Sequence, residues 1–175
     1  MNHGFTIWFT GLSGAGKTTI SRLVEADLRG RGLPVEVLDG DIVRQNLSQG
    51  LGFTKADRDT NILRIAFVSK LLTRNRVVTL VSAISPYRET REMARKEIGH
   101  FVEVYVKCPL DTCIARDTKG LYRKALEGAI PYFTGISDPY EEPLEPEIVL
   151  HTDQEAPQES AARIFSRLKE LGYLL

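Results

Sequence analysis

The sequence is short of several features that mark particular classes of protein. Its 175 residues include two cysteines, Cys108 and Cys113, whose spacing matches neither a zinc site nor a redox pair, so two reduced thiols are expected. No basic segment leads into an apolar stretch at the N-terminus, and no apolar run reaches the length of about 18 residues that a membrane span needs. The 23 basic and 23 acidic residues cancel, so no overall charge attracts nucleic acid or an anionic membrane. We therefore expect one cytoplasmic domain over residues 1–175, without nucleic-acid or membrane partners.

Short apolar runs alternate with segments whose apolar residues recur at helical spacing. This alternation predicts an α/β fold, in which a parallel five-stranded sheet carries helices on both faces. Ligands of such sheets bind at the carboxyl ends of the strands, so we expect the functional residues there. The predicted strands are residues 5–9, 35–38, 77–81, 101–106 and 147–150. Helices are predicted around residues 20–28, 62–72 and 161–171.

Residues 117–146 interrupt the alternation of strands and helices. This stretch is rich in glycine, proline and charged residues. A connection of that length in a small domain is more often a functional lid than filler, although a linker or a disordered segment would have a similar composition. We predict a lid over the strand ends.

The first predicted strand runs directly into GLSGAGKT, and an amphipathic helix is predicted after it. This is the G-x-x-x-x-G-K-[ST] pattern of a P-loop, whose backbone N–H groups and helix N-terminus hold phosphate oxygens. The lysine is placed to bind the β- and γ-phosphates, and the hydroxyl after it is placed to ligate Mg²⁺. The pattern predicts a P-loop NTPase-type fold that binds ATP through Gly11, Leu12, Ser13, Gly14, Ala15, Gly16, Lys17, Thr18 and Thr19.

A P-loop domain can be a GTP switch, an ATPase motor or a small-molecule kinase. The TKAD at 54–57 is similar to a guanine-binding element but follows the second predicted strand, too early in the chain, so we interpret it as a chance match. An ATPase motor needs an aspartate at the end of the third strand, but that strand ends in Ser82. Asp39 and Asp41 follow the second strand and could order Mg²⁺ or accept the proton of an attacking hydroxyl. One of the two could equally cap the helix that follows.

Three arginines follow predicted strand ends: Arg44, Arg58 and Arg88. Any one of them alone would be read as a solvated surface charge. A guanidinium donates hydrogen bonds in pairs with fixed geometry, which suits phosphate-like and sulfate-like groups. We expect two of the three to contact the substrate, and hence an anionic phosphoryl acceptor.

Several long motifs, in order, resemble those of the adenylylsulfate kinase family from about residue 5 to residue 171. They are TGLSGAGKTT, LDGDIVRQNLSQGLGF, DRDTNILRIAFVSKLL, VSAISPYR, RDTKGLYRKA and FTGISDPYE. The resemblance implies a kinase that uses MgATP to phosphorylate the 3′-hydroxyl of adenosine 5′-phosphosulfate, in sulfate assimilation. It also implies a stand-alone kinase without a sulfurylase region, and it allows a homodimer.

The resemblance also implies which residues form the site. Lys17 and Asp41 would be catalytic, and Thr18 and Asp41 would lie at the metal. Phe53 and Phe133 resemble the two aromatic rings that sandwich the substrate adenine, a role that stacking energies support. Tyr132 departs from the family, which often has Gly or Asn there. The residues implied to bind the acceptor are Asp41, Ile42, Val43, Arg44, Phe53, Arg58, Asn61, Ile84, Ser85, Lys119, Phe133 and Thr134.

Ser85 raises a separate question. The matching serine of the family has been described as a phosphoserine intermediate, which would make Ser85 a catalytic nucleophile. A serine needs an adjacent general base to attack, and no histidine lies near this loop in the sequence. Direct transfer, with Ser85 contacting the substrate, is the interpretation that we favour.

Two questions stay open from the sequence. Another P-loop kinase, acting on gluconate, shikimate or a nucleoside monophosphate, is an alternative, and a nucleotide-dependent switch is a more distant one. The residues that bind the ATP adenine are only weakly indicated. By analogy with the fold, we expect the region of Arg116 and the loop at 151–157.

Overall fold

The computed structural model describes residues 3–175 and contains a parallel sheet of five strands in the order β2-β3-β1-β4-β5. The predicted α/β fold is confirmed, and each predicted strand agrees with an observed one to within a residue at either end. The strands are β1 (Thr6–Thr10), β2 (Val35–Asp39), β3 (Val78–Ser82), β4 (Phe101–Lys107) and β5 (Ile148–His151).

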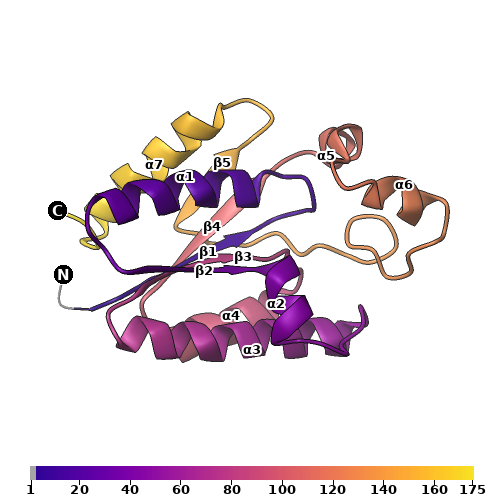
Figure 1. Cartoon of the computed structure of the whole chain (residues 1–175). Coiled ribbons are helices and arrows are strands. Elements are labelled where there is room, and N and C mark those ends of the chain that lie inside the picture. The colour runs from indigo at the N-terminus through magenta and orange to yellow at the C-terminus, as the bar shows by residue number, and fades with distance from the viewer. Residues whose placement is uncertain (1–2) are drawn as a thin grey trace.

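Helices cover both faces of the sheet (Figure 1). One face packs against α1 and α7, and the other packs against α3 and α4. The helices are α1 (Lys17–Gly30), α2 (Gly40–Asn46), α3 (Lys55–Arg74), α4 (Arg88–Ile98), α5 (Leu110–Arg116), α6 (Leu121–Leu126) and α7 (Pro157–Glu170). None of those in the described part of the chain is long and apolar enough to cross a membrane.

The central strand β1 contributes to two separate hydrophobic cores, because successive side chains of a strand point to opposite faces. Ile7 and Phe9 lie in the core beneath α1 and α7. Trp8 lies in the core beneath α3 and α4, where its ring stacks on Phe101 at 5.5 Å between centroids. All three β1 side chains are fully buried, so the strand is fixed from both sides.

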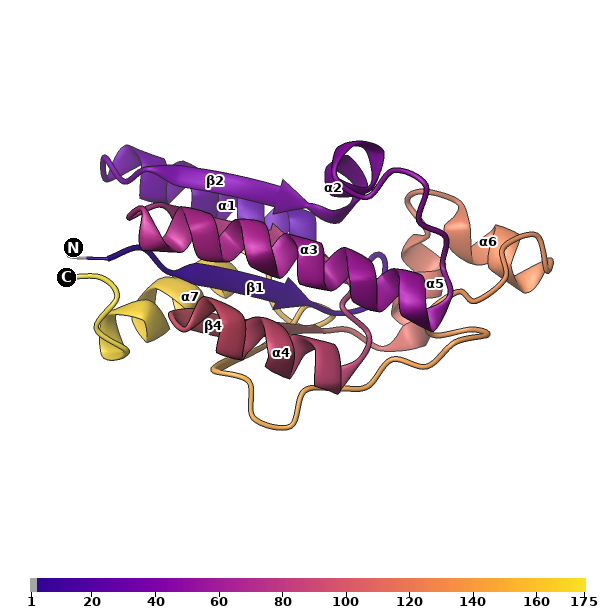
Figure 2. The same cartoon turned by 90° about the horizontal axis from the view of Figure 1, so that it is seen from below.

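The carboxyl ends of the strands all point to the same end of the molecule (Figure 2). The P-loop follows β1 there, α2 follows β2, and the loop at 83–87 follows β3. We call that last segment the serine loop. The first part of the predicted lid, residues 117–146, lies at this end too and includes the short helix α6, and the last part runs back along the molecule to the start of β5.

Candidate active site

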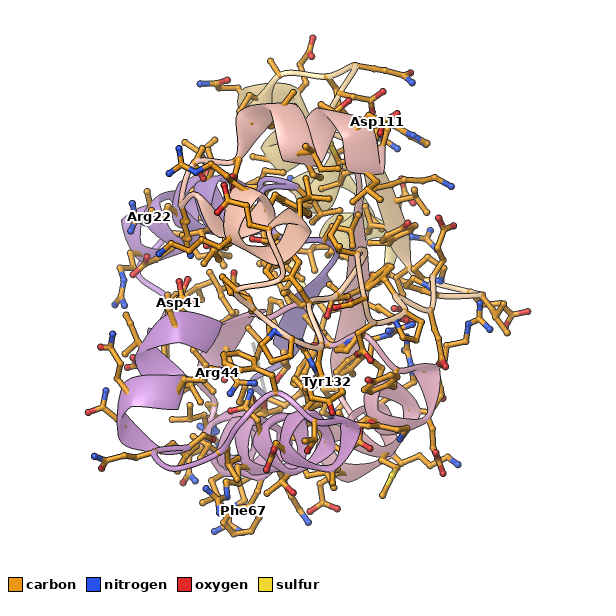
Figure 3. All side chains as sticks on the ribbon, turned by 90° about the vertical axis from the view of Figure 1, so that its right-hand side faces the viewer. Arg22, Asp41, Arg44, Phe67, Asp111 and Tyr132 are labelled. Carbon is orange, nitrogen blue, oxygen red and sulfur yellow. The ribbon has the colours of Figure 1, made fainter. Side chains whose placement is uncertain are left out.

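A cleft of about 860 Å³ lies at the carboxyl end of the sheet, between the P-loop, α2, the start of α3, the serine loop and the lid. This volume is near the upper end of the range usual for small-molecule sites. Figure 3 is seen from this end and labels Asp41 and Arg44 on α2 and Tyr132 on the lid. The sequence placed its functional residues at the strand ends, and the structure brings most of them into this one cleft.

Two glycines give the P-loop its shape. Gly11 has a φ of 148°, and a Cβ atom there would lie 2.4 Å from the carbonyl oxygen of Val106, closer than any side chain allows. Gly16 adopts a φ of 108° at the N-cap of α1. A glycine reaches such backbone angles without the steric cost that another residue would meet. The loop can therefore turn tightly and present N–H groups at the N-terminus of α1.

Lys17 lies at the first position of α1, within the loop. Its Nζ donates to the carbonyl oxygens of Gly11 at 2.9 Å and Leu12 at 2.8 Å. Burial lowers the pKa of Lys17 to about 8, although Asp39 and Asp41 act in the opposite direction. The side chain is held inside the loop at the edge of the cleft, where it can meet the phosphates of a nucleotide.

The two aspartates after β2 have different surroundings. Asp39 is the N-cap of α2, since its Oδ1 accepts from the backbone N–H of Asp41 at 3.0 Å, and its Oδ2 accepts from the Thr18 hydroxyl at 3.1 Å. Asp41 is exposed and forms an ion pair with Lys119 of the lid. Both aspartates line the cleft. The structure thus places Asp39, rather than the predicted Asp41, in contact with Thr18.

Two arginines lie close to the ring of Phe53 at the other end of the cleft. The guanidinium of Arg44 lies 4.5 Å from the ring centroid, and that of Arg58 lies 5.6 Å from it. Arg58 also donates to the Phe53 carbonyl oxygen at 3.0 Å. Burial lowers the pKa of both arginines, but a guanidinium starts so high that both stay charged. The aromatic ring of Phe53 and the positive charges of Arg44 and Arg58 therefore lie close together in the cleft.

The lid contributes a second aromatic ring and a buried hydroxyl to the same end. Phe133 lines the cleft and packs edge-on against Tyr122 at 5.1 Å between centroids. Thr134 Oγ1 and Asn61 Oδ1 are both buried and have no hydrogen-bond partner among the residues that the structure describes, and both residues line the cleft. A buried polar atom without a partner is costly, which makes these two atoms candidates for ligand contacts.

Tyr132 has a backbone φ of 55°, in the left-handed region that glycine and asparagine adopt more readily than other residues. This conformation places its carbonyl oxygen 2.5 Å from Nη2 of Arg58. The preference for Gly or Asn that the resemblance implied at this position thus has a backbone cause.

Ser85 lines the cleft and is only 2% exposed. Its hydroxyl oxygen accepts from the indole N–H of Trp8 at 3.0 Å, and its own closest acceptor is the Ala83 carbonyl oxygen at 3.5 Å. Among the described residues, no carboxylate or imidazole forms a hydrogen bond with this hydroxyl. The arrangement does not supply the general base that a serine nucleophile needs.

The lid is attached to the serine loop at its C-terminal end. The Tyr87 hydroxyl donates to Asp138 Oδ2 at 2.6 Å, and the Glu141 backbone N–H donates to the Pro86 carbonyl oxygen at 2.8 Å. Burial and the bond to Asp138 raise the pKa of Tyr87 to about 12. Arg91 bridges the two segments, since it donates to the carbonyl oxygens of Ser85 at 2.5 Å and Glu141 at 2.7 Å.

The region suggested for the ATP base lies beside the P-loop. Arg116 donates to the carbonyl oxygens of Gly14 at 3.3 Å and Thr152 at 2.6 Å, and the Thr152 hydroxyl donates to the Ala15 carbonyl oxygen at 2.6 Å. Arg116 and Thr152 both line the cleft, as does Pro157. Cys108 and Cys113 lie nearby as free, buried thiols, which agrees with the prediction.

Four residues predicted to bind a ligand do not line the cleft: Gly11, Leu12, Ile42 and Val43. Leu12 instead lines a neighbouring pocket. Val43 is buried in the core between α3 and the sheet, and Ile42 is exposed away from the lining of the cleft. The turn of α2 points these two side chains to other sides of the helix than Arg44. Arg88 does not line the cleft either, because its guanidinium donates to the Glu142 carbonyl oxygen at 2.7 Å. Arg44 and Arg58 are thus the two arginines of the predicted three that reach the site.

A family model for adenylylsulphate kinase matches residues 3–151. The chain belongs to the adenylylsulphate kinase family. Within that family, the adenylyl-sulfate kinase of Rippkaea orientalis is 63% identical over 171 residues, which cover 98% of this chain and 94% of that protein. The one of Picosynechococcus is 58% identical over 175 residues, which cover 99% of both. Among solved structures, the APS kinase of Mycobacterium tuberculosis in complex with AMPPNP and APS superposes with a TM-score of 0.93 at 42% identity, covering 97% of this chain and 99% of that one.

Membership of the adenylylsulphate kinase family confirms the resemblance seen in the motifs. The sequence patterns missed two features of the site. One is the contact between Thr18 and Asp39, which spacing alone could not separate from a contact to Asp41. The other is Trp8, whose indole N–H required a partner as soon as the strand was predicted to be buried.

Proposed function

We propose that this kinase transfers the γ-phosphoryl group of ATP to the 3′-hydroxyl of adenosine 5′-phosphosulfate. The observation that carries the proposal is the single cleft in which a P-loop faces an aromatic and arginine cluster on α2, α3 and the lid. The M. tuberculosis relative was solved with an ATP analogue and with APS together, and its fold matches this chain over nearly its full length.

The P-loop end would bind ATP. The N–H groups between Ser13 and Thr18, at the N-terminus of α1, would hold the phosphates, with Lys17 at the migrating group. The N–H of Gly11 instead donates to the Ile84 carbonyl oxygen. The adenine would lie against Arg116, Thr152 and the loop at 151–157, which closes this end of the cleft.

The Thr18 hydroxyl and the carboxylate of Asp39 would hold Mg²⁺. Both are oxygen donors, lie in contact at 3.1 Å and line the cleft, which suits a hard cation that binds few protein ligands. When bound, the ion supplies charge neutralisation on the phosphate oxygens. In this proposal Asp39 takes the metal role predicted for Asp41, and Asp41, paired with Lys119 of the lid, would act on the acceptor.

The opposite end would bind the acceptor nucleotide. Phe53 and Phe133 supply ring faces for its adenine, while Arg44 and Arg58 supply positive charge for its phosphosulfate group. The unpartnered atoms of Asn61 and Thr134 add hydrogen-bonding groups, with Lys119 and Ile84 at the rim.

Transfer would proceed directly between the two bound nucleotides. Phosphoryl transfer goes through a loose transition state, so the enzyme contributes mainly position and charge neutralisation. Asp41, exposed to the cleft, would accept or orient the proton of the 3′-hydroxyl. The lid would exclude water, which competes with the acceptor.

The test is a phosphoryl-transfer assay with labelled ATP and adenosine 5′-phosphosulfate, alongside gluconate, shikimate and AMP. We expect a 3′-phosphorylated product from the first acceptor only. Label transfer to one of the other acceptors, or release of phosphate with no acceptor dependence, would refute the proposal.

The role of Ser85 is tested separately by Ser85→Ala. Direct transfer predicts that the variant keeps turnover to within about tenfold, because only one hydrogen bond is lost. Loss of nearly all turnover with intact ATP binding would instead support a phosphoserine intermediate.

The cytoplasmic location and the homodimer stay predictions. Sedimentation of the purified chain would decide whether it forms a dimer.

A further inference from the structure

The chain has a single tryptophan, and that residue lies directly behind the active site. Trp8 is the middle residue of β1 and is fully buried beneath α3 and α4. Its indole N–H donates to the Ser85 hydroxyl oxygen at 3.0 Å. A buried indole needs a partner for its one donor, and here that partner is a side chain that lines the cleft.

The hydrogen-bonding capacity of Ser85 shows what this contact does. A serine hydroxyl can donate one proton and accept two. The Trp8 N–H takes one accepting position, and the remaining protein acceptor, the Ala83 carbonyl oxygen, lies at 3.5 Å, the outer limit of a hydrogen bond. Within residues 3–175, the proton of Ser85 therefore has no good acceptor, and it can be donated to a group in the cleft.

The backbone around Ser85 is held as firmly as its side chain. Ser85 has a φ of 49°, which is uncommon for a residue with a side chain. The Ile84 carbonyl oxygen accepts from the Thr10 hydroxyl at 2.7 Å. The carbonyl oxygen of Ser85 itself accepts from Arg91 at 2.5 Å. Such a conformation persists where the surroundings fix it, and it is found mainly at functional sites.

We propose that Trp8 is a positioning residue for acceptor binding. Its N–H fixes the Ser85 hydroxyl so that the serine donates its proton to an anionic oxygen of the acceptor nucleotide. This inference rests on the proposed function for the identity of the acceptor. It also gives a physical reason for direct transfer, since the serine oxygen is engaged by a donor and no carboxylate or imidazole in the described part of the chain bonds to its hydroxyl.

A spectroscopic test needs no substrate and is independent of the proposed function. Trp8 alone emits on excitation at the red edge of protein absorption, because the chain has no other tryptophan. Loss of the hydrogen bond in Ser85→Ala should shift the emission maximum to shorter wavelength. Thr134→Val, a matched change in the cleft away from Trp8, should leave it in place. An unchanged maximum in Ser85→Ala overturns the proposal.

A kinetic test uses Trp8→Phe, which keeps an aromatic ring in the core and removes the N–H. We expect the KM for adenosine 5′-phosphosulfate to rise about five- to tenfold, the usual effect of one hydrogen bond, with the KM for ATP unchanged. Phe101→Leu, which removes the ring that stacks on Trp8, should lower stability and leave both KM values in place.

A double-mutant cycle separates positioning from general packing. In the Ser85→Ala background, Trp8→Phe should add less than twofold to the acceptor KM, because both changes remove the same contact. A full additive effect, or a parallel rise in both KM values, overturns the proposal. If Trp8→Phe does not fold, Ser85→Ala must by itself both raise the acceptor KM and shift the emission maximum. The absence of either effect overturns the proposal.

Discussion

Asp39 has two separable roles, and two substitutions distinguish them. One carboxylate oxygen caps α2 by accepting from the N–H of Asp41, and the other accepts from the Thr18 hydroxyl. Asparagine is as good an N-cap as aspartate but carries no charge, whereas alanine removes both roles. Asp39→Asn should therefore keep its thermal stability and lose activity, and Asp39→Ala should lose activity and some stability.

The structure sets the size of each effect. Loss of an N-cap costs about 1 kcal/mol, which corresponds to a fall in Tm of roughly 2–4 °C for a chain of this length. Loss of the charge beside Thr18 should lower the apparent affinity for Mg²⁺ or the rate by about 10- to 100-fold, as substitution of residues that orient metal ligands does.

Thermal unfolding and Mg²⁺ titration of the phosphoryl-transfer rate measure the two effects. We expect Asp39→Asn to unfold at the wild-type temperature and to need more Mg²⁺, and Asp41→Asn to unfold similarly with its Mg²⁺ requirement unchanged. Wild-type Mg²⁺ dependence in Asp39→Asn, together with a raised requirement in Asp41→Asn, would show that the metal site involves the other aspartate.

Three further outcomes follow from the geometry of the cleft. Because burial lowers the pKa of Lys17 to about 8, ATP affinity should fall as the pH rises above 8, and binding there should take up most of a proton. Calorimetry in buffers of different ionisation enthalpy measures this uptake, which Lys17→Arg should abolish. Phe53→Ala should raise the acceptor KM about tenfold or more, because the stacking of adenine on the ring is lost. Tm should stay nearly unchanged, because Phe53 is 47% exposed. An unchanged KM would exclude stacking of the adenine on Phe53. Tyr132→Gly should relieve a backbone strain of about 1–2 kcal/mol, because glycine adopts the left-handed region freely. The greater conformational entropy of glycine in the unfolded chain offsets about 0.5–1 kcal/mol of this gain. Tm should therefore rise slightly, and a fall in Tm would contradict this account.

The strands and the P-loop could be predicted from the sequence because their signals are local. Apolar runs and the GLSGAGKT pattern need no knowledge of distant residues, and all five strands agree to within one residue. The helices α4, α5 and α6 were not predicted, since α4 has few apolar residues and the other two are short. Their apolar faces become apparent only when the sheet is in place.

The site was predictable as a set of residues but not as a set of contacts. The motifs place Asp39 and Asp41 two residues apart, and only the path of the chain into α2 decides which carboxylate meets Thr18. The same turn carries Val43 into the core while Arg44 reaches Phe53. The contact between Trp8 and Ser85 joins residues 77 positions apart, which no local pattern can reveal.

The unequal strength of the lid's attachments determines how nucleotides reach the cleft. The C-terminal part of the lid is bonded to the serine loop and to Arg91, and the buried Tyr122 of α6 donates to the Ser13 carbonyl oxygen of the P-loop at 2.8 Å. Toward α2, by contrast, the lid is linked by the exposed ion pair of Lys119 with Asp41. An exposed pair contributes about 0–1 kcal/mol, so thermal motion separates it easily. Exchange of nucleotides should therefore proceed on the side of α2, while the wall that carries Ser85 stays in place through each turnover.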